Sequence, residues 1–219
     1  MKVGVDAVLL GAWTHIPKGD VLEVGTGCGV IPLILAQRNN EINIEAIDID
    51  EESVEEAAEN FKNSPWKERL FVYNKDFENL RKRKHKRYDL IISNPPYFKS
   101  GILNPGTRRE KARHQDTLSV FSLISSCETL LKENGKLSMI FPMEFREEVA
   151  EYIQNHRMEI LRECRVRDNK NRLEKRIMLE IGFFRQRSDK EEVRHLTLFE
   201  DGEPSQEYKE LCKDLYLKF

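Results

Sequence analysis

Short apolar runs alternate with longer amphipathic segments from residue 21 to about residue 185. This alternation predicts a doubly wound α/β fold, in which helices cover both faces of a mostly parallel sheet. The runs expected to form parallel strands are 21–24, 43–49, 70–73, 88–93 and 136–141. The helices expected between them cover 30–37, the segment capped by Asp50, 119–131 with a C-cap at Asn134-Gly135, and 144–155.

Two further strand-like stretches, 159–166 and 177–184, are joined by a polar link too short for a crossover helix. They should therefore pair as an antiparallel hairpin at the end of a seven-stranded, Rossmann-like sheet. We expect one domain over residues 1–185. Residues 186–219 are predicted to be an extension packed on or trailing that domain, with a strand at 193–199 and a helix at 206–217.

The composition narrows the class of protein. A 39% apolar and 34% charged chain is ordinary for a soluble globular domain. No run approaches the roughly 18 apolar residues of a membrane span, and no leader opens the chain, so we expect a cytoplasmic protein without a membrane partner. Its cysteines stand far apart, which predicts reduced thiols and no metal site. Lys and Arg gather in 81–87, 99–113 and 157–176, so one face is expected to be basic despite a net charge of −2.

A glycine-rich segment, EVGTGCG at residues 23–29, stands where the first strand gives way to a helix. Its glycines permit a tight turn and let a ligand approach the backbone beside a helix N-terminus. A dinucleotide fingerprint requires Gly or Ala where Val30 stands, so the spacing argues against that cofactor class. Asp48, at the end of the second strand, is placed to accept hydrogen bonds from ribose hydroxyls. Asp76 ends the third strand and serves either the same ligand or a helix cap.

Asn94, Pro95, Pro96, Tyr97 and Phe98 follow the fourth strand at that same edge of the sheet. The prolines stiffen the turn and lack N–H groups, which leaves the neighbouring carbonyls free to point into a pocket. An Asn side chain and a proline carbonyl together suit an amino or amide nitrogen, whose two hydrogens they accept. The two aromatic rings supply flat faces for a flat substrate. The alternative is an ordinary proline-rich turn.

These motifs together resemble the class I S-adenosylmethionine-dependent methyltransferases that modify amino nitrogens, among them adenine-N6, guanine-N2 and release-factor glutamine-N5 enzymes. Residues 2–13 (KVGVDAVLLGAW) and 112–114 (ARH) resemble, more closely, the bacterial tRNA1(Val) adenine-N6 methyltransferase family. The similarity runs from residue 2 to about residue 185. Val5 departs from the threonine usual in the family, and the chain starts within the family's opening motif.

The resemblance implies methyl transfer from S-adenosylmethionine to the N6 amino group of an adenine in tRNA, next to the anticodon of tRNA-Val. It implies no metal and no particular oligomer. The catalytic corner would be Asn94, Pro95, Pro96 and Tyr97, which hold a flipped adenine. The cofactor-binding residues would be Asp6, Glu23, Gly25, Thr26, Gly27, Asp48, Ile49, Asp76, Phe77 and Asn94.

The residues expected to meet RNA follow the carboxyl ends of the strands, around the pocket mouth. The all-basic heptad 81–87 precedes the fourth strand, so it should lie at the opposite edge as a solvated loop. For the basic residues of the 159–184 hairpin, the alternative is likewise an ordinary hydrated turn. The expected substrate-binding residues are Phe98, Lys99, Arg109, Arg113, His114, Arg167, Arg172 and Arg176.

Two other functions compete with this interpretation. An N5-glutamine methyltransferase acting on a release factor would present the same corner to a similar NH₂ group. Such enzymes carry a separate N-terminal helical domain, for which the chain has no room before residue 20. A non-catalytic S-adenosylmethionine-binding RNA-interaction module is the second alternative, and the intact corner disfavours it.

Neutralising Arg167, Arg172 and Arg176 together is expected to weaken RNA binding, because these side chains would meet phosphates. Cofactor binding should not change. An RNA titration at one fixed low salt concentration, beside a cofactor titration, checks both statements. Unchanged RNA affinity would contradict this assignment of the hairpin.

Overall fold

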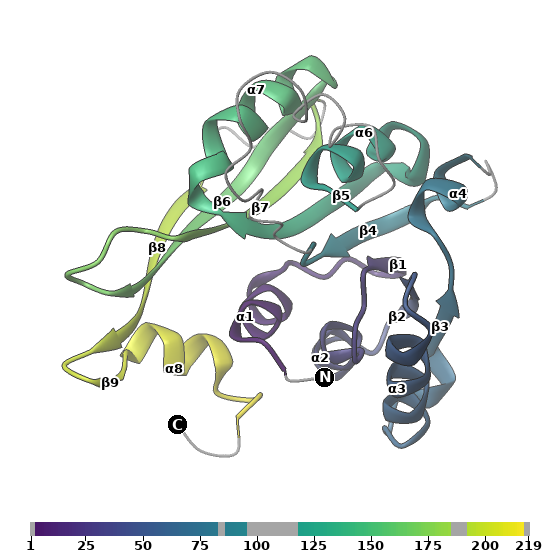
Figure 1. Cartoon of the computed structure of the whole chain (residues 1–219), viewed down its shortest axis with the longest axis horizontal. Coiled ribbons are helices and arrows are strands. Elements are labelled where there is room, and N and C mark those ends of the chain that lie inside the picture. The colour runs from purple at the N-terminus through teal and green to yellow at the C-terminus, as the bar shows by residue number, and fades with distance from the viewer. Residues whose placement is uncertain (1–2, 83–85, 96–117, 185–191, 217–219) are drawn as a thin grey trace, which may run out of the picture.

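The computed structural model describes residues 3–82, 86–95, 118–184 and 192–216. Within these ranges one nine-stranded sheet runs through the molecule, in the order β3-β2-β1-β4-β5-β7-β6-β8-β9 (Figure 1). Its parallel strands are β1 (Gly19–Val24), β2 (Ile42–Asp48), β3 (Leu70–Asn74), β4 (Tyr88–Ser93) and β5 (Leu131–Pro142). The remaining strands are β6 (Met158–Asn169), β7 (Arg176–Phe183), β8 (Glu192–Glu200) and β9 (Glu203–Pro204).

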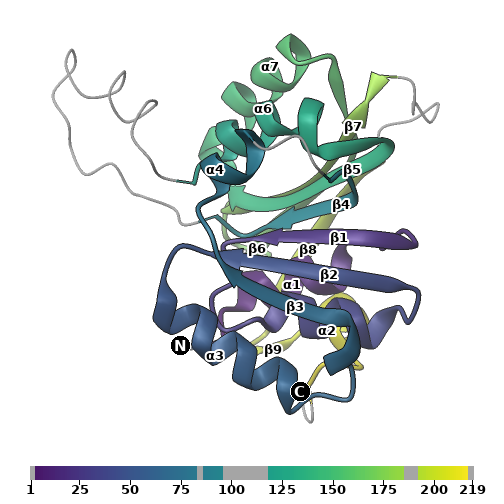
Figure 2. The ribbon, with the colours of Figure 1, turned by 90° about the vertical axis from the view of Figure 1, so that its right-hand side faces the viewer.

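Helices cover both faces of the sheet, as the alternating pattern predicts (Figure 2). On one face pack α1 (Val5–Trp13), α2 (Val30–Arg38), α3 (Glu51–Lys62) and α8 (Gln206–Cys212). The other face carries α4 (Phe77–Lys82), α6 (Val120–Leu130) and α7 (Arg146–Asn155). Short 3₁₀ turns lie at η1 (Lys67–Arg69) and η2 (Met143–Phe145).

Each central strand contributes to two apolar cores, because successive side chains point to opposite faces. Val21 joins the core under α1 and α2, whereas Leu22 joins the core under α6 and α7. On β4, Leu90 likewise joins the core under α1 and α2, and Ile91 joins the core under α6 and α7. Burial on both faces explains why these strands read as nearly continuous apolar runs.

The end of the chain differs from the sequence prediction. The predicted antiparallel hairpin is confirmed, since β6 pairs antiparallel with β7 and β7 with β5. The sheet does not stop there at seven strands, because β8 pairs parallel with β6 and β9 follows it. Helix α8 ends at Cys212 rather than at residue 217. The domain boundary drawn at residue 185 falls outside the described residues and stays a proposal.

Two further differences concern helices. The expected C-cap at Asn134-Gly135 is wrong, because α6 ends at Leu130 and β5 begins at Leu131. Glycine is required at 135 for another reason: a Cβ there would lie 2.7 Å from the Tyr88 carbonyl oxygen. Helix α1 has no counterpart in the sequence prediction, and its residues from Ala7 to Trp13 are buried.

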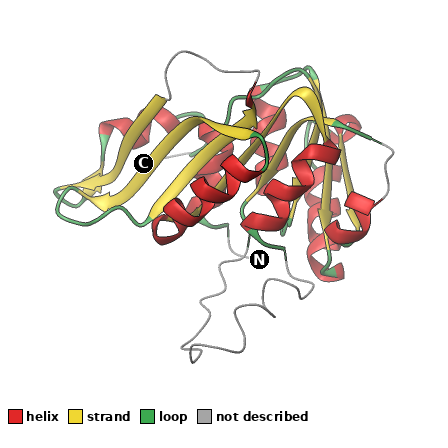
Figure 3. Cartoon of the chain, turned by 90° about the horizontal axis from the view of Figure 1, so that it is seen from above, coloured by secondary structure: helices red, strands yellow, loops and turns green. Residues whose placement is uncertain are grey.

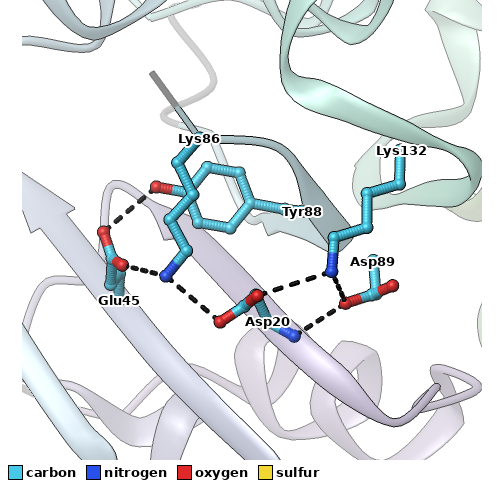
Figure 4. A network of polar contacts seen from close by, with 6 residues as sticks. All are labelled: Asp20, Glu45, Lys86, Tyr88, Asp89 and Lys132. Carbon is cyan, nitrogen blue, oxygen red and sulfur yellow. Dashed lines mark hydrogen bonds and ion pairs between the residues drawn. The ribbon is translucent and has the colours of Figure 1, made fainter.

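A charged network ties together the amino ends of the parallel strands (Figure 4). The Lys132 ammonium lies 2.7 Å from Asp89 and 3.4 Å from Asp20. Lys86, from the basic heptad, lies 3.1 Å from Asp20 and also pairs with Glu45. Burial opposes ionisation of Asp20, but the contacts with the two lysines outweigh it and lower the pKa of that carboxyl group. This end of the heptad therefore binds acids of its own chain, at the edge opposite the glycine turn.

Replacing Gly29 with Ala should destabilise the protein by about 2 kcal/mol or more, because strain and a steric clash add. Gly29 has φ +80°, and a Cβ there would lie 2.5 Å from a ring carbon of buried Phe61. Gly202→Ala is the matched control, since Gly202 has φ +88° with nothing within 4 Å. Urea unfolding should show the larger loss for Gly29→Ala. Equal losses would mean that the Phe61 contact costs nothing.

Candidate functional site

The glycine turn lies at the carboxyl end of β1 and is held against β2. Gly25, Gly27 and Gly29 have φ of 75°, 54° and 80°, a region that favours glycine. The backbone N–H groups of Gly25 and Thr26 both donate to the carbonyl of Ile47, at 2.9 and 3.1 Å. Three backbone positions in the left-handed region thus give the turn a tight, fixed path from strand to helix.

Asp48 supports this turn from the end of β2. Its Oδ2 accepts the Gly27 N–H at 2.9 Å, and its Oδ1 accepts the Asp50 N–H at 3.0 Å. A carboxylate has acceptor capacity beyond these two bonds, so Asp48 still suits ribose hydroxyls. Ile49 follows with its side chain 70% exposed, an apolar surface beside the carboxylate. Asp50 caps α3 as predicted, by accepting the Ser53 N–H.

Glu23 lies beneath the turn with 1% of its surface exposed. The Thr26 hydroxyl donates a hydrogen bond to its carboxyl group. Burial raises the pKa of Glu23 well above its usual value; the Thr26 bond opposes this rise and the nearby Asp48 charge adds to it. Folding therefore favours the protonated form of Glu23, which can both donate and accept hydrogen bonds.

A buried hydrogen bond joins the turn to the Asn-Pro corner. The Ser93 hydroxyl, at the end of β4, donates to the carbonyl of Val24 at 2.7 Å. The next residues along each chain segment are Asn94 and Gly25, so the corner and the glycine turn leave the sheet side by side. Sequence reasoning gave Ser93 no role, although a small hydroxyl residue ending an apolar strand was the available signal.

The corner itself is described only in part. Asn94 is half-buried and already engaged in an interaction, and Pro95 is buried. Pro96, Tyr97 and Phe98 lie outside the described residues. Leu118 is the first described residue after Pro95, and it lies over the glycine turn. A Cβ on Gly25 would meet Leu118 Cδ2 at 3.1 Å.

Asp76 and Phe77 occupy structural positions at the end of β3. Asp76 Oδ1 accepts the Glu78 N–H at 2.9 Å, and Oδ2 accepts the Asn79 amide at 3.2 Å. This is the capping role weighed as the alternative, at the start of α4. Phe77 is 5% exposed and packs into the core under α6. Cofactor contact by either residue stays a proposal.

Asp6 is predicted to bind the cofactor and Arg176 to bind RNA. In the structure these two residues contact each other. Their side chains lie 3.0 Å apart, and Arg176 also pairs with Asp168. Arg176 therefore ties the first turn of α1 to the hairpin. Because neutralising it disturbs α1 as well, a test of RNA contact at the hairpin is cleaner at Arg167 and Arg172.

The remaining predicted RNA residues divide into two groups. Arg167 is half-buried and its Nε donates to the Thr197 hydroxyl at 2.8 Å, whereas Arg172 is exposed in the hairpin turn. The hairpin turn lies at the carboxyl edge, since Arg176 pairs with Pro142 at the end of β5. The other residues lie outside the described residues: Lys99, Arg109, Arg113 and His114.

The described part of the chain has neither a metal-binding cluster nor a membrane-spanning helix. His, Cys, Asp and Glu side chains do not gather there in a group that could hold a metal ion. Among the described helices, none is long and apolar enough to cross a membrane.

Comparison with known proteins shows the family of the chain. The model of the methyltransferase small domain family matches residues 5–171. Among curated relatives, the tRNA1(Val) (adenine(37)-N6)-methyltransferase of Vibrio vulnificus strain YJ016 is 38% identical over 219 residues, covering 100% of this chain and 90% of the relative. The protein of the same name from Christiangramia forsetii is 38% identical over 224 residues, covering 100% and 92%.

Solved structures share the fold at low sequence identity. A predicted O-methyltransferase from Agrobacterium tumefaciens has a TM-score of 0.70 at 15% identity, covering 95% of this chain and 96% of that chain. A glycopeptide N-methyltransferase in complex with S-adenosyl-L-methionine has a TM-score of 0.57 at 10% identity, covering 81% and 92%. The fold is thus that of class I methyltransferases.

The raised pKa of Glu23 predicts a pH-dependent stability. A carboxyl group whose folded pKa exceeds its unfolded value of 4.5 contributes stability that is complete below that value. The contribution is lost as the pH rises through the folded pKa, by at most about 1.4 kcal/mol per pH unit.

Glu23→Gln removes this titration, so the wild type should lose stability relative to the variant as the pH rises. Urea unfolding at several values between about pH 5 and pH 8 measures the difference. The matched control is Glu55→Gln on the exposed surface of α3, for which no such trend is expected. Parallel curves for wild type and Glu23→Gln would contradict the assignment.

Proposed function

This chain belongs to the methyltransferase small domain family, and on that premise we propose that it transfers a methyl group from S-adenosylmethionine to the N6 amino group of an adenine in tRNA. The names of relatives that match along the whole chain support this substrate. They also support the adenine at position 37, next to the anticodon of tRNA-Val. We expect the reaction to take place in the cytoplasm, where tRNA is found.

The observation that carries the proposal is the buried Ser93–Val24 hydrogen bond. This bond holds the carboxyl ends of β4 and β1 level with each other along the sheet, so the Asn94-Pro95 corner lies beside the glycine turn. In our proposal the corner binds the NH₂ group and the turn binds the nucleoside cofactor, at one edge of the sheet. Methyl transfer requires this proximity, because the acceptor nitrogen must lie in line with the methyl group.

The residues of this edge fit S-adenosylmethionine. Asp48 has the acceptor capacity for two ribose hydroxyls, and exposed Ile49 offers an apolar face to a planar base. Because Gly25 and Gly27 have no side chains, we propose that the amino-acid part of the cofactor approaches the backbone of this turn, with Glu23 below it. When bound, this cofactor supplies an electrophilic methyl group on a sulfonium centre.

The corner orients the acceptor nitrogen. In our proposal the Asn94 side-chain oxygen and the Pro95 carbonyl accept the two hydrogens of the adenine amino group. Their direction turns the nitrogen lone pair towards the methyl group, and the proton released after transfer passes to solvent. Catalysis then comes from positioning, and no side chain has to act as a strong base. Tyr97, outside the described residues, is proposed to stack on the flipped base.

One assay tests the substrate. The protein is incubated with tritiated S-adenosylmethionine and bulk tRNA, a peptide release factor, or neither. We expect label in tRNA that yields N6-methyladenosine on digestion. Label confined to the release factor would favour the glutamine-N5 alternative, and label in neither, with cofactor bound, would favour a non-catalytic module.

Asn94→Ala should lower kcat/KM for tRNA by about 100-fold, the usual loss when one positioned polar group is removed. Cofactor affinity, measured by calorimetry, should fall less, because Asn94 is one of several residues expected to contact the cofactor but holds the acceptor nitrogen directly. Asn63→Ala, at the exposed end of α3, is the matched control and should keep full activity. Full activity of Asn94→Ala would disprove the positioning role.

A further inference from the structure

A fully buried carboxylate on β6 holds two arginines on the α7 side of the sheet. Glu163 has 0% of its surface exposed. Its Oε2 accepts from Nη2 and Nε of Arg146 at 3.0 and 3.3 Å, and its Oε1 accepts from Nε of Arg165 at 2.5 Å. A buried charge must be paired in this way, and the pairing fixes the orientation of both guanidinium groups.

The two arginines of the cluster reach water, whereas the carboxylate does not. The side chains of Arg146 and Arg165 are 27% and 28% exposed, whereas the Glu163 side chain is 0% exposed. Solvent therefore meets the cations and not the anion that orients them.

A second buried carboxylate on the neighbouring strand shows a closed arrangement for comparison. Glu180 is also 0% exposed, and it accepts from Arg162 at 2.9 Å and from the His15 N–H at 2.6 Å. Arg162 lies over the Trp13 ring at 4.4 Å and is only 12% exposed. There Arg162 fastens α1 to the sheet. Both arginines at Glu163 are more exposed than Arg162.

The strand register places the cluster near the reacting corner. Glu163 lies opposite Leu179, Leu179 opposite Met139, and Met139 opposite Ser93. Three strand spacings separate Glu163 from the residue before Asn94, which is about 14 Å along the sheet. Arg146 begins α7 just after the carboxyl end of β5, on the same edge.

A third arginine lies on the same face of β6 as Glu163 and Arg165. Arg167 lies two residues beyond Arg165, and its Nε contacts Thr197 on β8. Opposite Arg165 on β8 is exposed His195, which pairs with Glu174. Figure 3 looks onto this side of the sheet, where the strands of the hairpin end extend past α7.

We propose that Arg146 and Arg165, oriented by Glu163, bind phosphate groups of the RNA that flank the flipped base. The inference rests on the proposed function, since it takes tRNA as the substrate. Planar guanidinium forks match phosphate oxygens, and a fixed orientation lowers the entropy lost on binding. The distance from the corner suits nucleotides next to the target rather than the target itself.

The test replaces the whole cluster with neutral amides. Arg146→Gln, Glu163→Gln and Arg165→Gln together remove one net positive charge, and Glu163 does not remain as a buried carboxylate without its arginines. Lys18→Gln removes one positive charge from an exposed position before β1, at the opposite edge, and serves as the matched control. Thermal unfolding and S-adenosylmethionine affinity of each variant confirm that the fold and the cofactor site persist.

Binding of bulk tRNA is measured over a range of salt concentrations. For the triple variant we expect at least a tenfold lower affinity at low salt, with the slope of log K against log salt reduced by about 1.4 to 1.8 for two lost phosphate contacts. S-adenosylmethionine affinity should stay the same, and Lys18→Gln should bind tRNA as the wild type does. A folded triple variant with wild-type affinity and slope would overturn the inference.

A conservative variant keeps the test decisive if the triple variant does not fold. Arg146→Lys with Arg165→Lys retains both charges and their pairing with Glu163 but loses the planar forks. We expect an unchanged salt slope and a several-fold lower tRNA affinity; wild-type affinity would contradict the orienting role of Glu163. A wild-type protein that neither binds nor methylates tRNA overturns the proposed function and this inference with it. Wild-type methylation with unaffected variants overturns only the inference.

Discussion

The hydrogen bond from the Ser93 hydroxyl to the Val24 carbonyl fixes the geometry on which the candidate site depends. At the end of a parallel sheet the ladder of backbone bonds stops, and each chain segment is free to leave in its own direction. Ser93 extends the tie between β4 and β1 at this point, and Ile47 does the same between the glycine turn and β2. Three loops from separate parts of the chain thereby acquire one common frame.

Near this frame, three buried carboxyl groups avoid an uncompensated negative charge in three different ways. Glu23 is favoured in its protonated form and bonded to a hydroxyl, so no cation is needed beside the glycine turn. Glu180 is neutralised by an arginine that the Trp13 ring covers. Glu163 is paired with two arginines that reach water. Each solution matches its surroundings: the glycine turn, the contact of α1 with the sheet, and the face of the sheet beside α7.

Sequence reasoning succeeds where one periodic signal decides the outcome. The strands β1 and β4 were predictable because burial on both faces leaves a short, nearly continuous apolar run. The strand β2 was predictable because its apolar residues alternate with polar ones. Helix α1 was not, since it is buried nearly all round and shows no polar stripe. Gly135 was read as a helix cap, but it serves a close backbone approach to Tyr88 that only the sheet register reveals. The pairing of β8 with β6, and the meeting of Arg146 with Glu163, depend on strand order and not on local pattern.

Helix α1 is enclosed by elements from both ends of the chain. It packs against α2 and α8, Asp6 reaches Arg176, and His15 reaches Glu180 (Figure 1). During synthesis α1 leaves the ribosome long before α8 and the hairpin that cover it, because these elements come later in the chain. The nascent chain must therefore carry an apolar helix without its cover until α8 has been made. Enclosure of α1 is in this sense a late event in folding, although the helix precedes every strand of the sheet.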